Sequence, residues 1–291
     1  MPPRPVVVIT GATNGIGRLA ALELARQGVH LGVVARSGAK VDGLRGEIEE
    51  IAPGAPVDAF LVDLSSLQDV RQTGQEISAR YDRISVLINN AGVHAFSQRI
   101  TSEGFAEMVA VNYLAPWILT NALRDRLIAA APSRVVTVAS EAGRLHAKTI
   151  TPSRDITLTD DYTRRESMTL YGRSKLMDVM FTQELARRLA GTGVTANCCS
   201  PGFNVTGLGR DLPFAGVLHK ILTALRIGDP RRGAQIITRL ATDPAFIDTT
   251  GGYFSVRDAM PLECPEPGRG ADVQRELWDI TAELLAAQTS G

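Results

Sequence analysis

The sequence predicts an α/β fold, a doubly wound parallel sheet with helices on both faces. Apolar, β-branched runs recur along the 291 residues, with amphipathic stretches between them. The runs are continuous rather than alternating, as expected for strands that are buried on both faces. Repeated strand–helix–strand order then favours parallel strands that are joined by right-handed crossovers.

The first predicted strand is "PVVVIT", which ends before Gly11, and the first helix begins near Gly15. The later predicted strands are "HLGVVAR", "VDAFLVD", "ISVLINN", "SRVVTVAS", "GVTANCCSP" and "GGYFSV". The predicted helices include "RLAALELARQ", "VRQTGQEISARY" and "KLMDVMFTQELARRLA". No linker or internal repeat interrupts the pattern, so one domain is expected over residues 1–291. The least regular parts, near 145–167 and 206–230, follow strand ends and are expected to form substrate loops.

The composition excludes several classes of protein. Lys+Arg and Asp+Glu both number 31, so no net charge attracts nucleic acid or an anionic membrane. No apolar run reaches the roughly 20 residues of a membrane span, and the N-terminus lacks the features of a signal peptide. The three cysteines, with Cys198 and Cys199 adjacent, fit neither a disulfide framework nor a metal site and are expected to be packing residues. A cytoplasmic protein without a metal is therefore expected.

A glycine-rich stretch, "TGATNGIG", follows the first predicted strand and runs into a helix. Glycines permit a tight turn and a close approach of a pyrophosphate, and the helix N-terminus offers unpaired N–H groups. The Gly-x3-Gly-x-Gly spacing differs from the usual G-x-G-x-x-G fingerprint, and glycine turns also arise for purely steric reasons. Its position after the first strand favours a dinucleotide site that contains Gly11, Asn14, Gly15, Ile16 and Gly17.

The end of the second predicted strand discriminates between the two nicotinamide cofactors. NAD sites place an acidic residue about 20 residues beyond the glycine loop, whereas "VVARSG" has no carboxylate. Arg36 could instead bind a 2′-phosphate through bidentate, charge-assisted bonds, although an exposed strand-end arginine is the alternative. We therefore predict NADP(H) rather than NAD(H).

Two further strand ends carry polar groups at suitable places. Asp63, followed by Leu64, could accept a hydrogen bond from the adenine amino group. The "NNAG" stretch would place Asn90, Ala91 and Gly92 beside the ribose. Taken singly, each of these residues could equally be a turn former.

These motifs are followed in order by "VNYLAP", "VTVAS", "YGRSK" and "PGFNVT". The series resembles the short-chain dehydrogenase/reductase family from about Pro5 to Val256. The long gap from Ser140 to Tyr171, the string "SKLMDVMFTQELARRLAGTGV" and a following "TGL" resemble its retinol-dehydrogenase-like and protochlorophyllide-reductase-like branch. The resemblance implies a Rossmann fold and an oxidoreductase that acts on a carbonyl or alcohol of a small molecule.

The resemblance also implies a catalytic tetrad of Asn112, Ser140, Tyr171 and Lys175. Lys175 lies four residues after Tyr171, so both side chains emerge on one helix face. A phenol has an ordinary pKa of about 10, and a cation ~4 Å away stabilises the phenolate by roughly 4 kcal/mol at an effective dielectric near 20. In reduction Tyr171 would protonate the carbonyl oxygen, which Ser140 would hold by a hydrogen bond.

Further roles follow from the resemblance alone. Lys175 would hold the nicotinamide ribose, and Asn112 would support a water that links Lys175 to solvent. The turn with Pro201, Gly202, Val205 and Thr206 would contact the nicotinamide carboxamide. Taken by themselves, Asn112 could simply bend a helix, Ser140 could cap a strand end and Tyr171 could be a core aromatic.

The substrate is less well defined by the sequence. Apolar residues between Leu208 and Leu225 predict an amphipathic lid helix and an apolar substrate, although that face could pack on the core or on another subunit. His94, Glu141 and His146 could border the substrate or be surface residues.

Two expectations concern the protein as a whole. Family habit implies a homodimer or homotetramer formed through helices near 114–130 and 171–190. A non-catalytic NADPH-binding sensor or scaffold is the alternative function, against which the intact tetrad argues.

Overall fold

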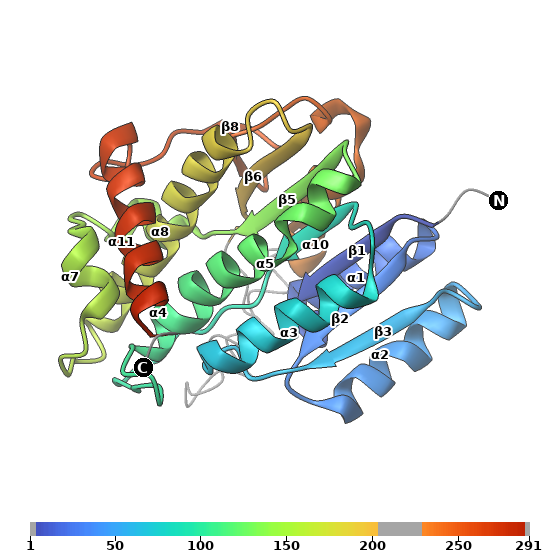
Figure 1. Cartoon of the computed structure of the whole chain (residues 1–291), viewed down its shortest axis with the longest axis horizontal. Helices are drawn as coiled ribbons and strands as arrows, with labels where there is room; N and C mark the ends of the chain where they lie inside the picture. The colour runs from blue at the N-terminus through green and yellow to red at the C-terminus, as the bar shows by residue number, and fades with distance from the viewer. Residues whose placement is uncertain (1–3, 203–228, 289–291) are drawn as a thin grey trace.

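The computed structural model describes residues 4–202 and 229–288, which form one sheet in the order β3-β2-β1-β4-β5-β6-β7-β8 (Figure 1). Strands β1 to β7 pair in parallel, and β8 pairs antiparallel with β7 at the edge. The strands are β1 (Val6–Thr10), β2 (His30–Ala35), β3 (Val57–Leu61), β4 (Val86–Asn89), β5 (Ser133–Val138), β6 (Val194–Ser200), β7 (Tyr253–Ser255) and β8 (Pro261–Leu262).

Helices connect most of these strands. They are α1 (Gly15–Arg26), α2 (Gly38–Ile51), α3 (Leu67–Arg80), α4 (Glu107–Val109), α5 (Ala115–Ala129), α6 (Glu141–His146), α7 (Pro152–Thr157), α8 (Ser167–Arg188), α10 (Pro230–Thr242) and α11 (Ala271–Ala287). A π-helical turn, η1 (Ala110–Leu114), joins α4 to α5, and a 3₁₀ turn, η2 (Pro244–Phe246), follows α10.

The sheet separates two apolar layers. Val8 of β1 packs with residues of α3, α5, α8 and α11, whereas Val7 and Ile9 pack with residues of α1, α2 and α10. Successive side chains of a strand point to opposite faces, so every central strand contributes to both layers. The predicted doubly wound α/β fold with helices on both faces is confirmed.

All seven predicted strands are present, and β8, α2, α10 and α11 are additions that the sequence pattern did not predict. The stretch 145–167, expected to be irregular, contains the short helix α7. The predicted lid between Leu208 and Leu225 lies outside the described residues.

The C-terminal helix α11 packs across the outer side of α8 and α5 (Figure 1). The Trp278 ring stacks on Phe181 of α8 with 5.7 Å between centroids, and its centroid lies 5.4 Å from that of Trp117 of α5. Part of the α5 and α8 surface for which the family resemblance implies subunit contacts is therefore covered by the chain's own helix. Self-association through these helices stays a prediction.

The order of the strands positions the functional site. Chain connections run outward in opposite directions from β1 and β4, which are hydrogen-bonded neighbours with Ile9 opposite Ile88. The carboxyl ends of β1 and β4 therefore lie side by side at a topological switch point, where open α/β sheets bind their ligands. Residues 11–17 follow β1, and residues 90–92 follow β4.

Candidate active site

The glycine loop after β1 is packed tightly against the loop after β4. Gly11 and Gly15 have φ values of 70° and 55°, in the region that favours glycine. A Cβ on Gly17 would lie 2.3 Å from Asn90 Nδ2 and 2.5 Å from the Gly11 carbonyl oxygen. The Asn90 amide donates to the carbonyl oxygens of Thr10 and Gly11 at 2.9 and 3.3 Å. Asn90 thus holds the loop in place, a role that the sequence motif did not reveal.

Two features of this loop suit the binding of a cofactor that carries phosphates and hydrogen-bond donors. Helix α1 begins at Gly15 with no acidic residue in its first turn, so its N–H groups and partial positive charge remain available to a phosphate. The buried Asn90 Oδ1 has no hydrogen-bond partner among the described residues, which leaves an acceptor for a donor of the cofactor. Asn14 and Ile16 lie at the start of the same turn.

The residues predicted to choose the nucleotide lie at the neighbouring strand ends. Arg36 is exposed directly after β2, where its guanidinium could reach a phosphate. Asp63 Oδ1 accepts from the backbone N–H and the hydroxyl of Ser65 at 3.0 and 2.8 Å, and Leu64 is buried. Asp63 therefore stabilises the turn after β3, and its contact with an adenine stays a prediction.

The catalytic lysine predicted from sequence lies in the interior of the protein. Lys175 is 4% exposed, and its Nζ donates to the Val138 carbonyl oxygen at the end of β5 at 2.9 Å. A Cβ on Gly92 would lie 3.4 Å from Lys175 Nζ and 3.3 Å from Asn112 Oδ1. The loop after β4, the π-helical turn η1 and helix α8 therefore meet around this ammonium group.

Asn112 is held rigidly beside the loop after β4. Its Oδ1 accepts from the Val93 N–H at 2.8 Å, and its Nδ2 donates to the Val93 carbonyl oxygen and to Ser174 Oγ at 3.0 and 2.9 Å. It lies in the π-helical turn η1, which presents it toward α8 and the loop after β4. The catalytic role of Asn112 and the alternative of a helix-bending residue both stay predictions.

Ser140, at the start of α6, and Tyr171, on α8, belong to two helices that pack against each other. Ser140 is the N-cap of α6, where its Oγ accepts from the Ala142 N–H at 3.2 Å. A Cβ on Gly172 would lie 2.7 Å from the Ala142 carbonyl oxygen, so glycine allows the close contact between the helices. Tyr171 is 8% exposed and contacts the small apolar cluster that includes Ala142 and Met108.

The three polar residues proposed to border the substrate differ in position. The His94 ring stacks on the Tyr171 ring with 4.8 Å between centroids and 26° between planes, and its Nε2 lies 3.1 Å from Ser167 Oγ. Burial lowers the pKa of His94 and so favours the neutral ring. Glu141 pairs with Arg144 at 3.0 Å, and His146 is exposed at the end of α6. Of these three residues, His94 is the one whose ring packs on Tyr171.

The turn after β6 begins at the expected place. Pro201 and Gly202 follow β6 directly, and Gly202 has a φ of 76°. Val205 and Thr206, the predicted contacts of the nicotinamide carboxamide, lie outside the described residues.

One buried acidic residue next to Lys175 was not predicted from the sequence motifs. Asp178 is 1% exposed, and its Oδ2 lies 2.8 Å from Lys175 Nζ. Burial raises the pKa of Asp178 to about 6 in spite of the opposing effect of Lys175. The signal that could have indicated it is an acidic residue one turn after Lys175 in the apolar string "KLMDVMF".

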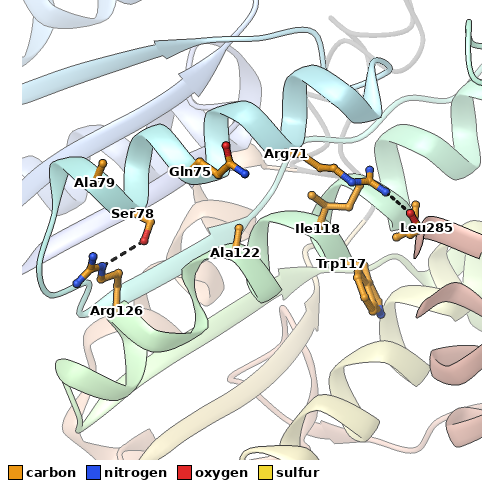
Figure 2. A pocket seen from close by; sticks show the side chains of 9 residues that line it. All are labelled: Arg71, Gln75, Ser78, Ala79, Trp117, Ile118, Ala122, Arg126 and Leu285. Carbon is orange, nitrogen blue, oxygen red and sulfur yellow. Dashed lines mark hydrogen bonds between the residues drawn. The ribbon is translucent and has the colours of Figure 1, made fainter. Parts of the chain in front are cut away.

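An open groove of about 480 Å³ lies away from these strand ends, between α3 and α5 (Figure 2). Arg71 Nη2 donates to the Leu285 carbonyl oxygen at 2.7 Å, and Arg126 Nε donates to Ser78 Oγ at 3.1 Å. Both arginines at the groove are thus hydrogen-bonded within the chain, and the groove takes no part in the site described above.

The described residues hold no group of three His, Cys, Asp or Glu side chains that could bind a metal ion. No helix within residues 4–202 and 229–288 has both the length and the apolar composition that crossing a bilayer requires. Cys198, Cys199 and Cys264 are free and buried, as expected of packing residues.

Comparisons with known proteins agree with this geometry. A sequence profile described as short chain dehydrogenase matches residues 5–152. Human retinol dehydrogenase 13 is 34% identical over 98% of this chain and 86% of its own length. A candidate daunorubicin C-13 ketoreductase from Streptomyces sp. (strain C5) is 35% identical over 97% of this chain and 93% of its own length.

Solved structures show the same architecture. An uncharacterized protein from Mycobacterium paratuberculosis superposes with a TM-score of 0.74 at 26% identity, covering 97% of this chain and 93% of that chain. A candidate NAD(P)-dependent gluconate 5-dehydrogenase from Beutenbergia cavernae, solved with NADP at low occupancy, has a TM-score of 0.67 at 27% identity, covering 88% and 96%.

The packing of the glycine loop leads to a first prediction. Gly17→Ala should lower the free energy of unfolding by about 1–3 kcal/mol and weaken NADPH binding, because the added methyl group overlaps Asn90 and the Gly11 carbonyl. Gly46→Ala is the matched control, since Gly46 is exposed in α2 with nothing within 4 Å of an added Cβ. That change should raise stability by about 0.5–1 kcal/mol.

Urea denaturation and a fluorescence titration with NADPH measure both effects. Equal stability and equal NADPH affinity in the two variants would contradict the assigned packing.

Proposed function

The chain belongs to the short-chain dehydrogenase family, whose members are alcohol and carbonyl oxidoreductases with a nicotinamide cofactor, and from this premise we propose a specific activity. The protein uses NADPH to reduce a carbonyl group of an apolar small molecule, or NADP⁺ to oxidise the corresponding alcohol. Tyr171 is the proton donor in reduction and the proton acceptor in oxidation. The alternative of a non-catalytic sensor is set aside, because the relatives are named dehydrogenases and a ketoreductase.

One observation carries the proposal, namely that Lys175, one helical turn after Tyr171, is buried where η1, the loop after β4 and the end of β5 meet. An ammonium group has three N–H donors. Two of them are used by Val138 and Asp178, which leaves one for a hydroxyl of the cofactor or for Tyr171. The Lys175 ammonium can therefore interact with the phenol while it keeps its hydrogen bonds to Val138 and Asp178.

Ser140 is suited to orient the reacting oxygen. Its Oγ accepts the Ala142 N–H, so its own hydroxyl proton is free to donate to a carbonyl oxygen. A substrate oxygen held between this hydroxyl and the phenol is positioned to receive the proton of Tyr171. A bound nicotinamide supplies the hydride acceptor or donor, and the protein groups supply orientation and the proton.

An apolar substrate is supported by the side chains around the phenol. Tyr171 packs in a cluster with Ala95, Met108 and Ala142, and Leu170 and Met168 pack against it. Met168 and Leu170 are only partly buried, and such apolar side chains near the phenol favour an apolar substrate over a polar one, because binding removes apolar area from water. The name of the human relative, a retinol dehydrogenase, is consistent with this chemistry.

NADP rather than NAD is supported by the strand end of β2. The exposed Arg36 follows β2 directly, and the "VVARSG" stretch carries no carboxylate to bind a 2′-hydroxyl. The NADP in the Beutenbergia cavernae structure accords with this preference.

The proposed mechanism predicts a selective loss in Tyr171→Phe. NADPH should bind with wild-type affinity, while turnover should fall about 100- to 10,000-fold, because the proton donor is removed. Tyr81→Phe is the matched control, since the Tyr81 hydroxyl donates to Asp58 at 2.7 Å at β3, remote from the tetrad. Steady-state rates and a binding titration measure both properties, and retained turnover in Tyr171→Phe would refute the mechanism.

The cofactor proposal predicts a change in preference in Arg36→Ala. The KM ratio of NADPH to NADH should rise about 10- to 100-fold, because a charge-assisted contact to the 2′-phosphate is lost. Arg83→Ala removes an exposed arginine at the opposite end of the sheet, before β4, and should leave the ratio unchanged. An unaltered ratio in Arg36→Ala would show that Arg36 does not read the phosphate.

A further inference from the structure

The Lys175 ammonium forms a buried ion pair that the proposed mechanism does not require. Asp178 follows Lys175 by three residues on α8, so both side chains lie on the same side of the helix. Lys175 Nζ donates to Asp178 Oδ2 at 2.8 Å, and the two residues are 4% and 1% exposed. The second bond of the ammonium, to the Val138 carbonyl oxygen, ties the pair to the end of β5.

Packing alone gives no reason for a carboxylate at this position. Asp178 Oδ1 is buried and has no hydrogen-bond partner among the described residues. Burial of a charged group with an unsatisfied oxygen is costly, and an amide would fill the same space and still offer an acceptor oxygen to Lys175. The negative charge itself is therefore the property to be explained.

The groups that face this pair are uncharged near neutral pH. Tyr113 approaches from η1, and Cys198 and Cys199 approach from β6. Burial raises the pKa of the Tyr113 phenol and of the Cys198 thiol, and it raises that of the Cys199 thiol to about 12. His94, on the Tyr171 ring, has a pKa that burial lowers.

The two members of the pair are themselves ionised near neutral pH. Burial disfavours the Lys175 ammonium, but the charge and hydrogen bond of Asp178, together with Tyr171 and Cys199, outweigh this effect and raise the pKa of Lys175. The Asp178 carboxyl, with its pKa of about 6, is ionised at pH 7 and above. Near the Tyr171 phenol, the electrostatic effect of Lys175 is therefore that of an ion pair rather than that of a lone cation.

We propose that Asp178 is a positioning residue for the proposed reaction. Its carboxylate fixes the Lys175 ammonium and offsets the charge of that group. In this way Asp178 sets the pH range in which Tyr171 accepts a proton. The two opposite charges lie 2.8 Å apart and act on the phenol in opposite directions, so the Asp178 carboxylate cancels part of the effect of the Lys175 ammonium. The ammonium keeps its geometry toward the cofactor and the phenol, and alcohol oxidation becomes efficient at higher pH than with an unpaired lysine. This inference rests on the proposed function.

Asp178→Asn tests the proposal, because it keeps the shape of the side chain and an acceptor oxygen for Lys175 while it removes the charge. The pH midpoint at which kcat/KM for alcohol oxidation with NADP⁺ rises should fall by about one unit, because loss of a nearby negative charge makes the Tyr171–Lys175 pair release its proton more easily. Ultraviolet titration of the cofactor-free protein, with the Tyr171→Phe background subtracted, should show the same shift in the phenolate absorbance.

Glu184→Gln is the matched control on the same helix. Glu184 is also a buried carboxylate, 4% exposed, but it pairs with Arg187 and Arg188, both at 2.7 Å, beyond the site. Its removal should leave both midpoints at the wild-type value. If Asp178→Asn does not fold, as judged by circular dichroism, Asp178→Ser removes the same charge and leaves room for water.

The possible outcomes separate this inference from the proposed function. Wild-type turnover that depends on Tyr171, together with unshifted midpoints in a folded Asp178 variant, overturns the role of Asp178 alone. An equal shift in Glu184→Gln also overturns it, because the effect would then be a general response to lost charge. Turnover that does not depend on Tyr171 overturns the proposed function itself, while the ultraviolet titration still reports on Asp178.

Discussion

The buried ammonium of Lys175 is the constraint on which the arrangement of the site depends. A charge in the interior is tolerated only when it is paired and hydrogen-bonded. The Val138 carbonyl and the Asp178 carboxylate provide these partners, one from the end of β5 and one from α8 itself. Lys175 thereby joins α8 to the carboxyl end of the sheet, and Tyr171 lies one helical turn earlier on the same helix.

The arrangement of the site also depends on a close approach of backbone segments, which glycine residues allow. A side chain at Gly17 would overlap Asn90, and one at Gly172 would overlap the Ala142 carbonyl oxygen. Gly92 leaves space directly beside Lys175 and Asn112. Glycine is thus needed for two different reasons. Gly17 allows the tight packing of the turn after β1, and Gly172 allows the close packing of α6 against α8.

The sequence allows the central features to be predicted because they depend on local patterns. Continuous apolar runs predict the parallel strands, and the four-residue spacing of Tyr171 and Lys175 predicts a shared helix face. The stack of His94 on Tyr171 and the covering of α8 by α11 could not be predicted, because each joins segments that are far apart in the chain. Asp178 is visible one turn after Lys175, but its burial and missing second partner depend on η1 and β6, which only the fold brings near.

We propose that the protein is an NADPH-dependent carbonyl reductase whose proton donor, Tyr171, is supported by a paired lysine. The most direct test of this proposal is the absorbance of NADPH in the presence of the purified protein and a set of apolar aldehydes and ketones. We expect the absorbance to fall when protein and an apolar carbonyl are both present, and to fall more slowly when NADH replaces NADPH. Tight NADPH binding with no loss of absorbance for any of these carbonyls would contradict the account.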